Sequence, residues 1–200
     1  CEEDEDFGQW LLRHASRPPV LMRDFALGVD GGMIYPTFTS VNAEAAPLQV
    51  GPDVILEEDT RIGQCWRTTV PSQVGISTPV LIHPSNVTID HIPHEIAADI
   101  RRAPRHMILW GVVDGDSNEH RLRTLSSLTS PRILSGHSII ALAEFEYGIH
   151  DGAPVQTFPV FDYIALSGMD FGIFLLDIMD NWGASDVCIY RVRIHGQPAQ

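Results

Sequence analysis

Residues 181–196 read Asn-Trp-Gly-Ala-Ser-Asp-Val-Cys-Ile-Tyr-Arg-Val-Arg-Ile-His-Gly, a turn that leads into an alternating segment. A period of two divides the segment into two faces, one with Cys188, Tyr190, Val192 and Ile194, the other with Ile189, Arg191, Arg193 and His195. Such alternation is typical of a strand with one face in the core and the other in water. The stretch therefore predicts a C-terminal strand whose Cys188 points inward.

The rest of the chain after Asp24 has a similar pattern. Short apolar runs are separated by Gly, Pro, Asn and Ser at intervals of about ten residues, which is typical of β-sandwiches and barrels. Predicted strands include residues 25–27, 132–134 and 163–166, whereas the polar residues 114–119 and 148–154 are predicted to be exposed loops. The fold class predicted is all-β, an antiparallel sandwich.

The N-terminal residues differ from this pattern. An acidic run is followed by apolar residues at helical spacing until Pro18 and Pro19, so we expect a short helix within residues 1–22 and one β domain over 23–198. The helix is either a solvated end or the end of an upstream coiled coil. No apolar run is long enough to span a membrane. Because the sequence begins with Cys1, we expect a fragment whose targeting or membrane segment lies upstream.

Charge restricts the partners of the protein. Of its 200 residues, 26 are acidic and 13 are basic, which gives a formal net charge of −13. Nucleic-acid binders concentrate basic residues to displace counterions, so no nucleic acid is expected as a partner. The sequence has no lysine, so every side chain with a permanent positive charge is an arginine, which binds carboxylates well.

The cysteines and one sequon depend on the compartment. Three cysteines allow a single disulfide in an oxidising lumen, or free thiols elsewhere. Asn86-Val87-Thr88 has the form of a glycosylation site, so Asn86 is a possible acceptor in a secretory lumen.

Five groups of motifs, in order along the chain, carry a family resemblance. They are Asp24-Phe25-Ala26-Leu27 with Gly31-Gly32; Gly63-Gln64-Cys65-Trp66; Ile82-His83-Pro84 with Val87-Thr88-Ile89-Asp90-His91-Ile92-Pro93; Ala103-Pro104-Arg105 with Trp110-Gly111; and the stretch 181–196. The chain resembles the SUN domain (Sad1/UNC-84-like) of nuclear-envelope bridging proteins. The resemblance implies a jelly-roll, galactose-binding-like sandwich that forms a homotrimer above a coiled coil in the perinuclear space. It also implies a partner, the C-terminal tail of a KASH protein of the outer nuclear membrane.

The resemblance further implies a braced loop. Cys65 and Cys188 are expected to form a disulfide that closes a loop around a structural monovalent cation, K⁺ or Na⁺. The ligands implied are the main-chain carbonyls of Val54, Glu57, Asp59, Gln64 and Tyr190. Carbonyl oxygens suit hard cations, and Glu57-Glu58-Asp59 adds a favourable field. No organic cofactor is expected.

A peptide site is implied in the same way. His91 and Tyr190 stand at two positions of the family's carboxylate pocket, whereas Arg102 replaces a serine and Asp186 a tyrosine. Arg102 either binds the peptide carboxylate, pairs with Asp186, or belongs to a solvated face. Residues 42–53 stand at the place of a lid that adds a strand to the partner, with Val41, Asn42, Leu48 and Val50 as further peptide contacts.

One other function remains open. Jelly-roll sandwiches also bind carbohydrates, so a galactose-binding-like carbohydrate module is the alternative. Catalysis is not expected, because no nucleophile or carboxylate pair is singled out, and His83, His91 and His94 lack a metal-ligand spacing.

Overall fold

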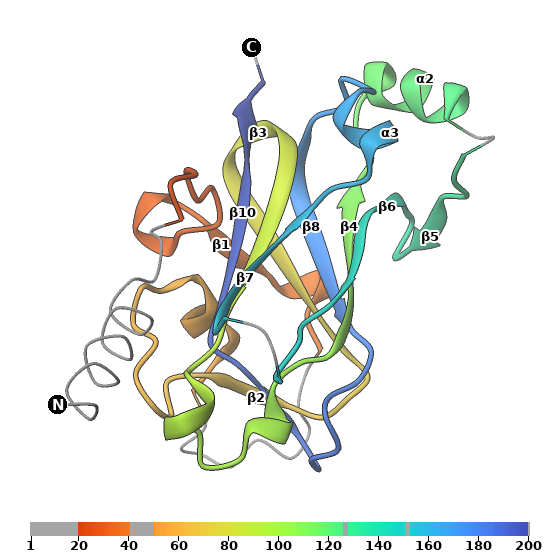
Figure 1. Ribbon diagram of the computed structural model, residues 1–200. Coiled ribbons are helices and arrows are strands. Elements are labelled where there is room, and N and C mark those ends of the chain that lie inside the picture. Colours follow the sequence, from red (N-terminus) through yellow and green to blue (C-terminus); the bar gives the residue numbers. More distant parts are fainter. Residues whose placement is uncertain (1–19, 41–49, 126–127, 151–152, 200) are drawn as a thin grey trace, which may run out of the picture.

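The computed structural model describes residues 20–40, 50–125, 128–150 and 153–199, and Figure 1 shows them as layered strands with few helices. The strands are β1 (Met33–Tyr35), β2 (Trp66–Thr68), β3 (Ser72–Asp90), β4 (His106–Val112), β5 (Arg132–Leu134), β6 (His137–Glu146), β7 (Val155–Pro159), β8 (Phe171–Ile178), β9 (Val187–Ile189) and β10 (Arg191–Pro198). All pairings between them are antiparallel. The predicted all-β antiparallel sandwich is confirmed.

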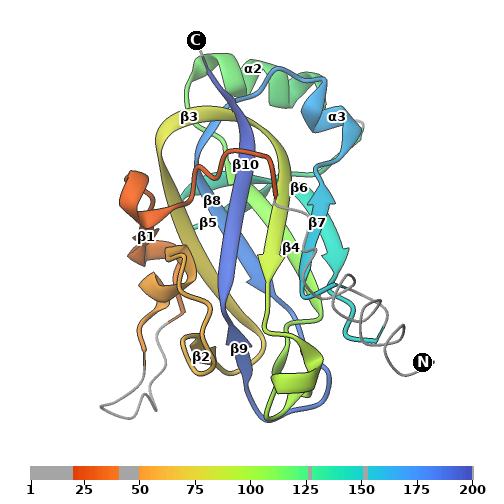
Figure 2. The same cartoon turned by 60° about the vertical axis from the view of Figure 1, so that its left-hand side comes forward.

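Strand β3 connects the two layers of the sandwich. Its first part pairs with β1 and β8, and the main layer continues through β4 and β6 to β5. The register with β8 shifts between Ser77 and Ile82, and beyond this point β3 pairs with β10 and β7. Figure 2 shows β3 as an arch whose two arms lie on either side of β10. One long strand therefore serves both layers.

The core lies between these layers. It is formed by alternate residues of the strands, among them Met107 and Leu109 of β4, Phe174 and Leu176 of β8, and Val192 and Ile194 of β10. A smaller cluster around Trp110 and Leu175 covers the opposite face of the main layer. The apolar side chains alternate because successive residues of a strand point to opposite faces.

The predicted wet face of the C-terminal stretch was wrong. Ile189 and His195 are 1% and 0% exposed, and Arg191 is also buried. Ile189 belongs to the main core. At β10 the reason is a cover that the alternation does not reveal: the main-chain N–H of Phe25 donates to the carbonyl of Ile194 at 2.8 Å, so residues 23–26 lie along β10. The chain also leaves the ladder with β2 at Tyr190, which divides the predicted strand into β9 and β10.

Three local predictions also require correction. Residues 25–27 are not a strand, residues 163–166 begin in helix α3 (Asp162–Ala165), and part of the predicted loop 114–119 is in helix α2 (Asp116–Thr124). Helix α2 has acidic residues in its first turn and arginines in its last, which suits the helix dipole. Short 3₁₀ helices are η1 (Gly28–Asp30), η2 (Pro36–Phe38), η3 (Pro52–Leu56), η4 (His94–Ile96) and η5 (Ile100–Arg102).

The N-terminal helix expected within residues 1–22 lies outside the described residues, apart from 20–22, which are not helical. None of the helices in the described part of the chain has the length and apolarity needed to cross a bilayer.

Candidate functional site

A disulfide joins the two strands of the small second sheet. Cys65 directly precedes β2, Cys188 lies in β9, and their Cα atoms are 5.5 Å apart. Figures 1 and 2 place this sheet at the end of the sandwich far from the C-terminus, beside the segment that carries η4 and η5. The expected disulfide is confirmed, and it links positions separated by 123 residues.

The turn before β9 is organised by one side chain. The Oδ1 of Asn181 accepts hydrogen bonds from the N–H groups of Gly183 and Ala184, and its Nδ2 donates to the carbonyls of Ala184 and Asp186. Gly183 has a φ of 100°, which favours glycine. The main-chain N–H of Trp182 donates to the carbonyl of Arg101, which attaches the turn to η5. The Asn-Trp-Gly sequence thereby fixes the backbone around Asp186.

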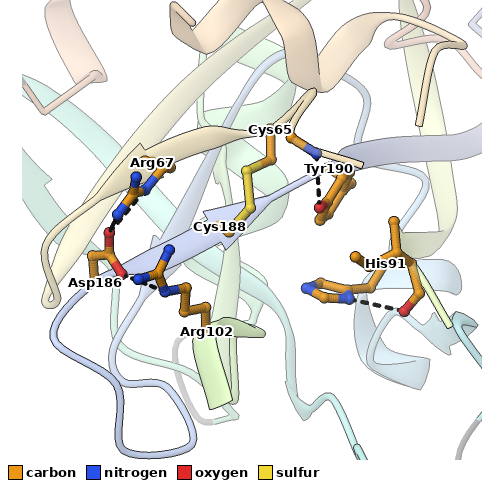
Figure 3. The surroundings of a disulfide bond; sticks show 9 residues. Cys65, Arg67, His91, Arg102, Asp186, Cys188 and Tyr190 are labelled. Carbon is orange, nitrogen blue, oxygen red and sulfur yellow. Dashed lines mark hydrogen bonds and ion pairs between the residues drawn. A yellow bond between two sulfur atoms is a disulfide. The ribbon is translucent and has the colours of Figure 1, made fainter. Parts of the chain in front are cut away.

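Asp186 lies between two arginines (Figure 3). Its Oδ2 accepts hydrogen bonds from the Nε of Arg67, at 2.8 Å, and from Nη2 of the same residue. Its Oδ1 lies 3.2 Å from the Nε of Arg102. Of the alternatives for Arg102, the structure therefore shows the ion pair with Asp186.

His91 and Tyr190 lie together on the other side of the disulfide (Figure 3). Their rings meet edge to face with centroids 4.9 Å apart. The Tyr190 hydroxyl accepts a hydrogen bond from the N–H of Gly63 at 3.3 Å, which leaves its own proton available to a ligand. Of the four predicted pocket residues, the structure thus brings His91 near Tyr190 and Arg102 near Asp186.

His91 is buried, with 3% of its surface exposed. Its Nδ1 donates to the carbonyl of Ile92 at 3.0 Å, and its Nε2 is buried without a hydrogen-bond partner among the described residues. Burial lowers the pKa of His91 below its ordinary value, and the hydrogen bond to Ile92 opposes this shift. The imidazole is therefore held neutral at pH 7, with an unused polar atom.

A pocket of about 500 Å³ opens beside His91. Its other lining residues come from two loops, Thr60, Arg61 and Ile62 from one and Ile92, Pro93 and Ile96 from the other. Ile62 and Ile96 are 61% and 51% exposed, which is unusual for large apolar side chains. The pocket thus combines an apolar rim with a buried polar wall, as ligand sites do.

The loop expected to hold a cation, residues 57–64, supplies part of the lining of this pocket. It follows η3, and Asp59 and Arg61 form a two-point ion pair within it. This pair is exposed, and the hydrogen bond from Arg61 lowers the pKa of Asp59. Outside the strand ladders, the hydrogen bonds of the described residues use one of the five expected carbonyls, that of Val54, which accepts from Glu57. Carbonyl oxygens suit a hard cation, and the binding of one at this loop stays a prediction.

The remaining predicted residues are placed as follows. Val50 packs, partly buried, against the main core, whereas Val41, Asn42 and Leu48 lie outside the described residues. Asn86 is half-buried in β3, between β10 and β7. The sequon's Thr88 is fully buried, with its hydroxyl 2.8 Å from the Nε2 of His195.

Sequence reasoning missed Arg67, although a signal was present. In the β2–β9 ladder Arg67 is opposite Cys188, so Arg67 and Asp186 are diagonal neighbours. Cys65, two residues before Arg67, has the same diagonal relation to Cys188. A predicted disulfide therefore also predicts an Arg67–Asp186 contact in an antiparallel pair.

Solved structures with a similar fold include a family 32 carbohydrate-binding module from Streptococcus pneumoniae EndoD, with a TM-score of 0.56 and 11% identity. That match covers 88% of this chain and all of the other. A structure of allantoicase matches with a TM-score of 0.51 and 12% identity over 90% of this chain and 44% of the other. At such low identity these similarities show the fold alone.

Sequence comparisons are more specific. SUN domain-containing protein 2 of Mus musculus is 29% identical over 94% of this chain and 25% of its own length. SUN domain-containing protein 3 of Homo sapiens is 27% identical over 100% of this chain and 54% of its own length. The nuclear migration and anchoring protein unc-84 of Caenorhabditis elegans is 24% identical over 88% of this chain and 16% of its own length.

This chain thus spans between about one sixth and about half of those relatives. The family model described as Sad1 / UNC-like C-terminal matches residues 46–198, which is most of the described β-sandwich. The chain therefore belongs to the Sad1 / UNC-like C-terminal family, the family of SUN domains.

Proposed function

We propose that this chain is the lumenal SUN domain of a nuclear-envelope bridging protein and binds the C-terminal tail of a KASH-type protein of the outer nuclear membrane. In this proposal the domain lies in the perinuclear space and transmits force as a tether, without catalysis. Membership of the SUN family supports this proposal, as does the name of the worm relative, a nuclear migration and anchoring protein.

One observation carries the proposal, the pocket beside His91. The exposed side chains of Ile62 and Ile96 can cover apolar residues of a peptide, because apolar area removed from water is stabilising. The Tyr190 hydroxyl, which accepts from the N–H of Gly63, can donate to a polar group near the end of the tail. An extended peptide end with an apolar character and a free carboxylate fits this arrangement.

Two braces stabilise the site in this proposal. The disulfide attaches Cys188, and with it the start of the Tyr190 segment, to the end of the loop 57–64. A monovalent cation, K⁺ or Na⁺, would bind the carbonyls of Val54, Glu57, Asp59, Gln64 and Tyr190 and fix the same loop. Both braces would order the pocket wall before the peptide arrives, which reduces the entropy lost on binding.

Assembly belongs to the same proposal. We place the SUN domain at residues 23–198 and expect a homotrimer above an upstream coiled coil, with residues 41–50 in contact with the peptide. A chain extended upstream should sediment as a trimer. A stable monomer at high concentration would contradict the trimer without affecting the peptide site.

The test is binding of a synthetic KASH-protein tail by calorimetry. Ile96→Glu should abolish binding, because the variant places a charge on the apolar rim of the pocket; Ile96 is half exposed, so the fold should survive. His91→Ala should weaken binding, whereas His94→Ala, which changes an exposed histidine three positions away, should not. Tight binding by Ile96→Glu would remove this pocket from the function.

The carbohydrate alternative rests on the fold alone. Glycan-array binding by a protein that shows no affinity for any KASH tail would favour it over a peptide receptor.

A further inference from the structure

The ion pair between Asp186 and Arg102 is poorly made. The Oδ1 of Asp186 and the Nε of Arg102 are 3.2 Å apart, yet no hydrogen bond forms between them, and both atoms are buried without another hydrogen-bond partner in the described structure. A buried donor and a buried acceptor that do not bond are each unfavourable. Arg102 therefore has a partner of opposite charge, but its Nε–H forms no hydrogen bond with that partner.

The cause is the second arginine. Asp186 directs its Oδ2 to Arg67, which donates from both Nε and Nη2. A carboxylate can form two parallel hydrogen bonds with one guanidinium only when both its oxygens face that group. The contact with Arg67 prevents this arrangement at Arg102.

The backbones on both sides are held in place. Asn181 donates to the carbonyl of Asp186, and the N–H of Arg102 donates to the carbonyl of Asp99. Asp186 therefore cannot shift its backbone to improve its contact with Arg102. A change of rotamer, in contrast, would separate the two side chains without disturbing the fold. The side chain of Arg102 is 38% exposed, so solvent reaches part of it.

We infer that Arg102 is a carboxylate receptor and that Asp186 occupies it as a weak internal substitute until a peptide carboxylate displaces it. The inference rests on the proposed function, because the incoming carboxylate is that of the bound tail. A free carboxylate can align both oxygens with Arg102, whereas Asp186 cannot while it remains bonded to Arg67. Asp186 would then retain Arg67 as its partner. Arg102 thus exchanges a carboxylate that it shares with Arg67 for one of its own in the complex.

The inference predicts opposite effects for two neighbouring variants. Asp186→Asn removes the competing charge, so the preference for a free-acid tail over its amide should rise about tenfold. Arg67→Gln releases Oδ2, which lets Asp186 bind Arg102 with both oxygens, so the same preference should fall. Arg102→Gln should reduce the preference as well. A variant that merely loses its fold would bind the free acid and the amide equally poorly, so it could not imitate a changed preference.

The experiment is calorimetry with a synthetic KASH-protein tail as free acid and as amide, on variants checked by thermal melting. An unchanged or reduced preference in Asp186→Asn would overturn the inference. If neither form binds the unmodified protein, the proposed function fails, and the inference is then tested with N-acetylglycine. In that titration the Nε–H signal of Arg102, followed by NMR, should shift at lower concentration in Asp186→Asn than in the unmodified protein. No shift in Asp186→Asn would overturn the inference.

Discussion

Arg191 and Asp24 form a buried ion pair in which Nη2 lies 2.9 Å from Oδ2 and the side chains are 8% and 9% exposed. Asp24 also accepts hydrogen bonds from the N–H groups of Ala26 and Ile194. One carboxylate therefore fixes the segment 23–26 over β10, near the N-terminal end of the described chain.

Asp24→Ala should destabilise the protein by about 3–5 kcal/mol, because it leaves the buried charge of Arg191 uncompensated. Urea unfolding measures this loss. The control is Glu144→Gln, which removes the charge from the exposed contact between His106 and Glu144 and should leave the unfolding midpoint nearly unchanged. Equal effects of the two variants would show that burial does not set the strength of the Asp24 pair.

Cys188→Ser should lower the free energy of unfolding by about 2–4 kcal/mol under oxidising conditions, because the disulfide restricts a long loop of the unfolded chain. In excess reductant the unmodified protein should lose the same stability and melt with the variant. If the variant remains less stable than the unmodified protein in reductant, the loss comes from the serine side chain and not from the missing disulfide.

His195 should make stability depend on pH. Burial lowers its pKa, the neighbouring Asp24 and Asp90 partly oppose this shift, and the neutral ring donates from Nδ1 to the carbonyl of Arg23 while Nε2 accepts from Thr88. In the unfolded chain His195 gains a proton near its ordinary pKa of 6.5. In the folded protein the same protonation needs a lower pH. The contribution of His195 to the free energy of unfolding is thus fully present above pH 6.5 and is lost as the pH falls below it.

His195→Asn keeps a donor near Arg23 but cannot titrate, so unfolding free energies measured at about pH 5.5 and about pH 7.5 should differ less in the variant than in the unmodified protein. An unchanged difference would remove His195 as a source of the dependence.

Gly196→Ala should destabilise the protein by about 1–3 kcal/mol or prevent folding, because an added Cβ would lie 2.3 Å from the carbonyl oxygen of His83 at the bulge of β10. Gly51→Ala is the matched control. Gly51 has a φ of −68°, and the nearest atom to its added Cβ is 3.6 Å away, so this change should be neutral or slightly stabilising. The melting temperatures of both variants, compared with that of the unmodified protein, test this prediction.

Removal of monovalent metal ions should lower the melting temperature if the loop 57–64 holds a cation. At about 100 times its dissociation constant, K⁺ would stabilise the fold by about 2.7 kcal/mol relative to choline at equal ionic strength. The same melting curve in K⁺, Na⁺ and choline would contradict a bound ion.

Much of the β framework could be predicted, because strand patterns depend on neighbours along the chain. Residues 132–134 were predicted as a strand and form β5 with the same bounds. Helix α2 was missed because its sequence is nearly all polar, and its anchor is distant: the Nδ2 of Asn118 donates to the carbonyl of Asp170 at 2.7 Å. Strand β3 is also continuous across Ser85, although its sequence pattern predicts two strands, residues 74–84 and 86–91.

The candidate site was predicted unevenly. The resemblance identified the cysteine pair, which the structure confirms, but left open the role of Arg102. That role depends on Arg67, whose contact with Asp186 arises from the pairing of two strands far apart in sequence. A residue-by-residue transfer cannot contain this contact, because Asp186 stands where the resemblance places a tyrosine.

The sequence alone determined that residues 181–196 form a turn and an alternating segment, because side-chain direction in a strand is a local property. It could not determine which face meets water. Arg191 and His195 are polar, and their burial depends on residues 23–26, which supply a carboxylate and a carbonyl as partners. Only the tertiary structure brings those partners to β10, and buried polar groups are tolerated only where such partners exist.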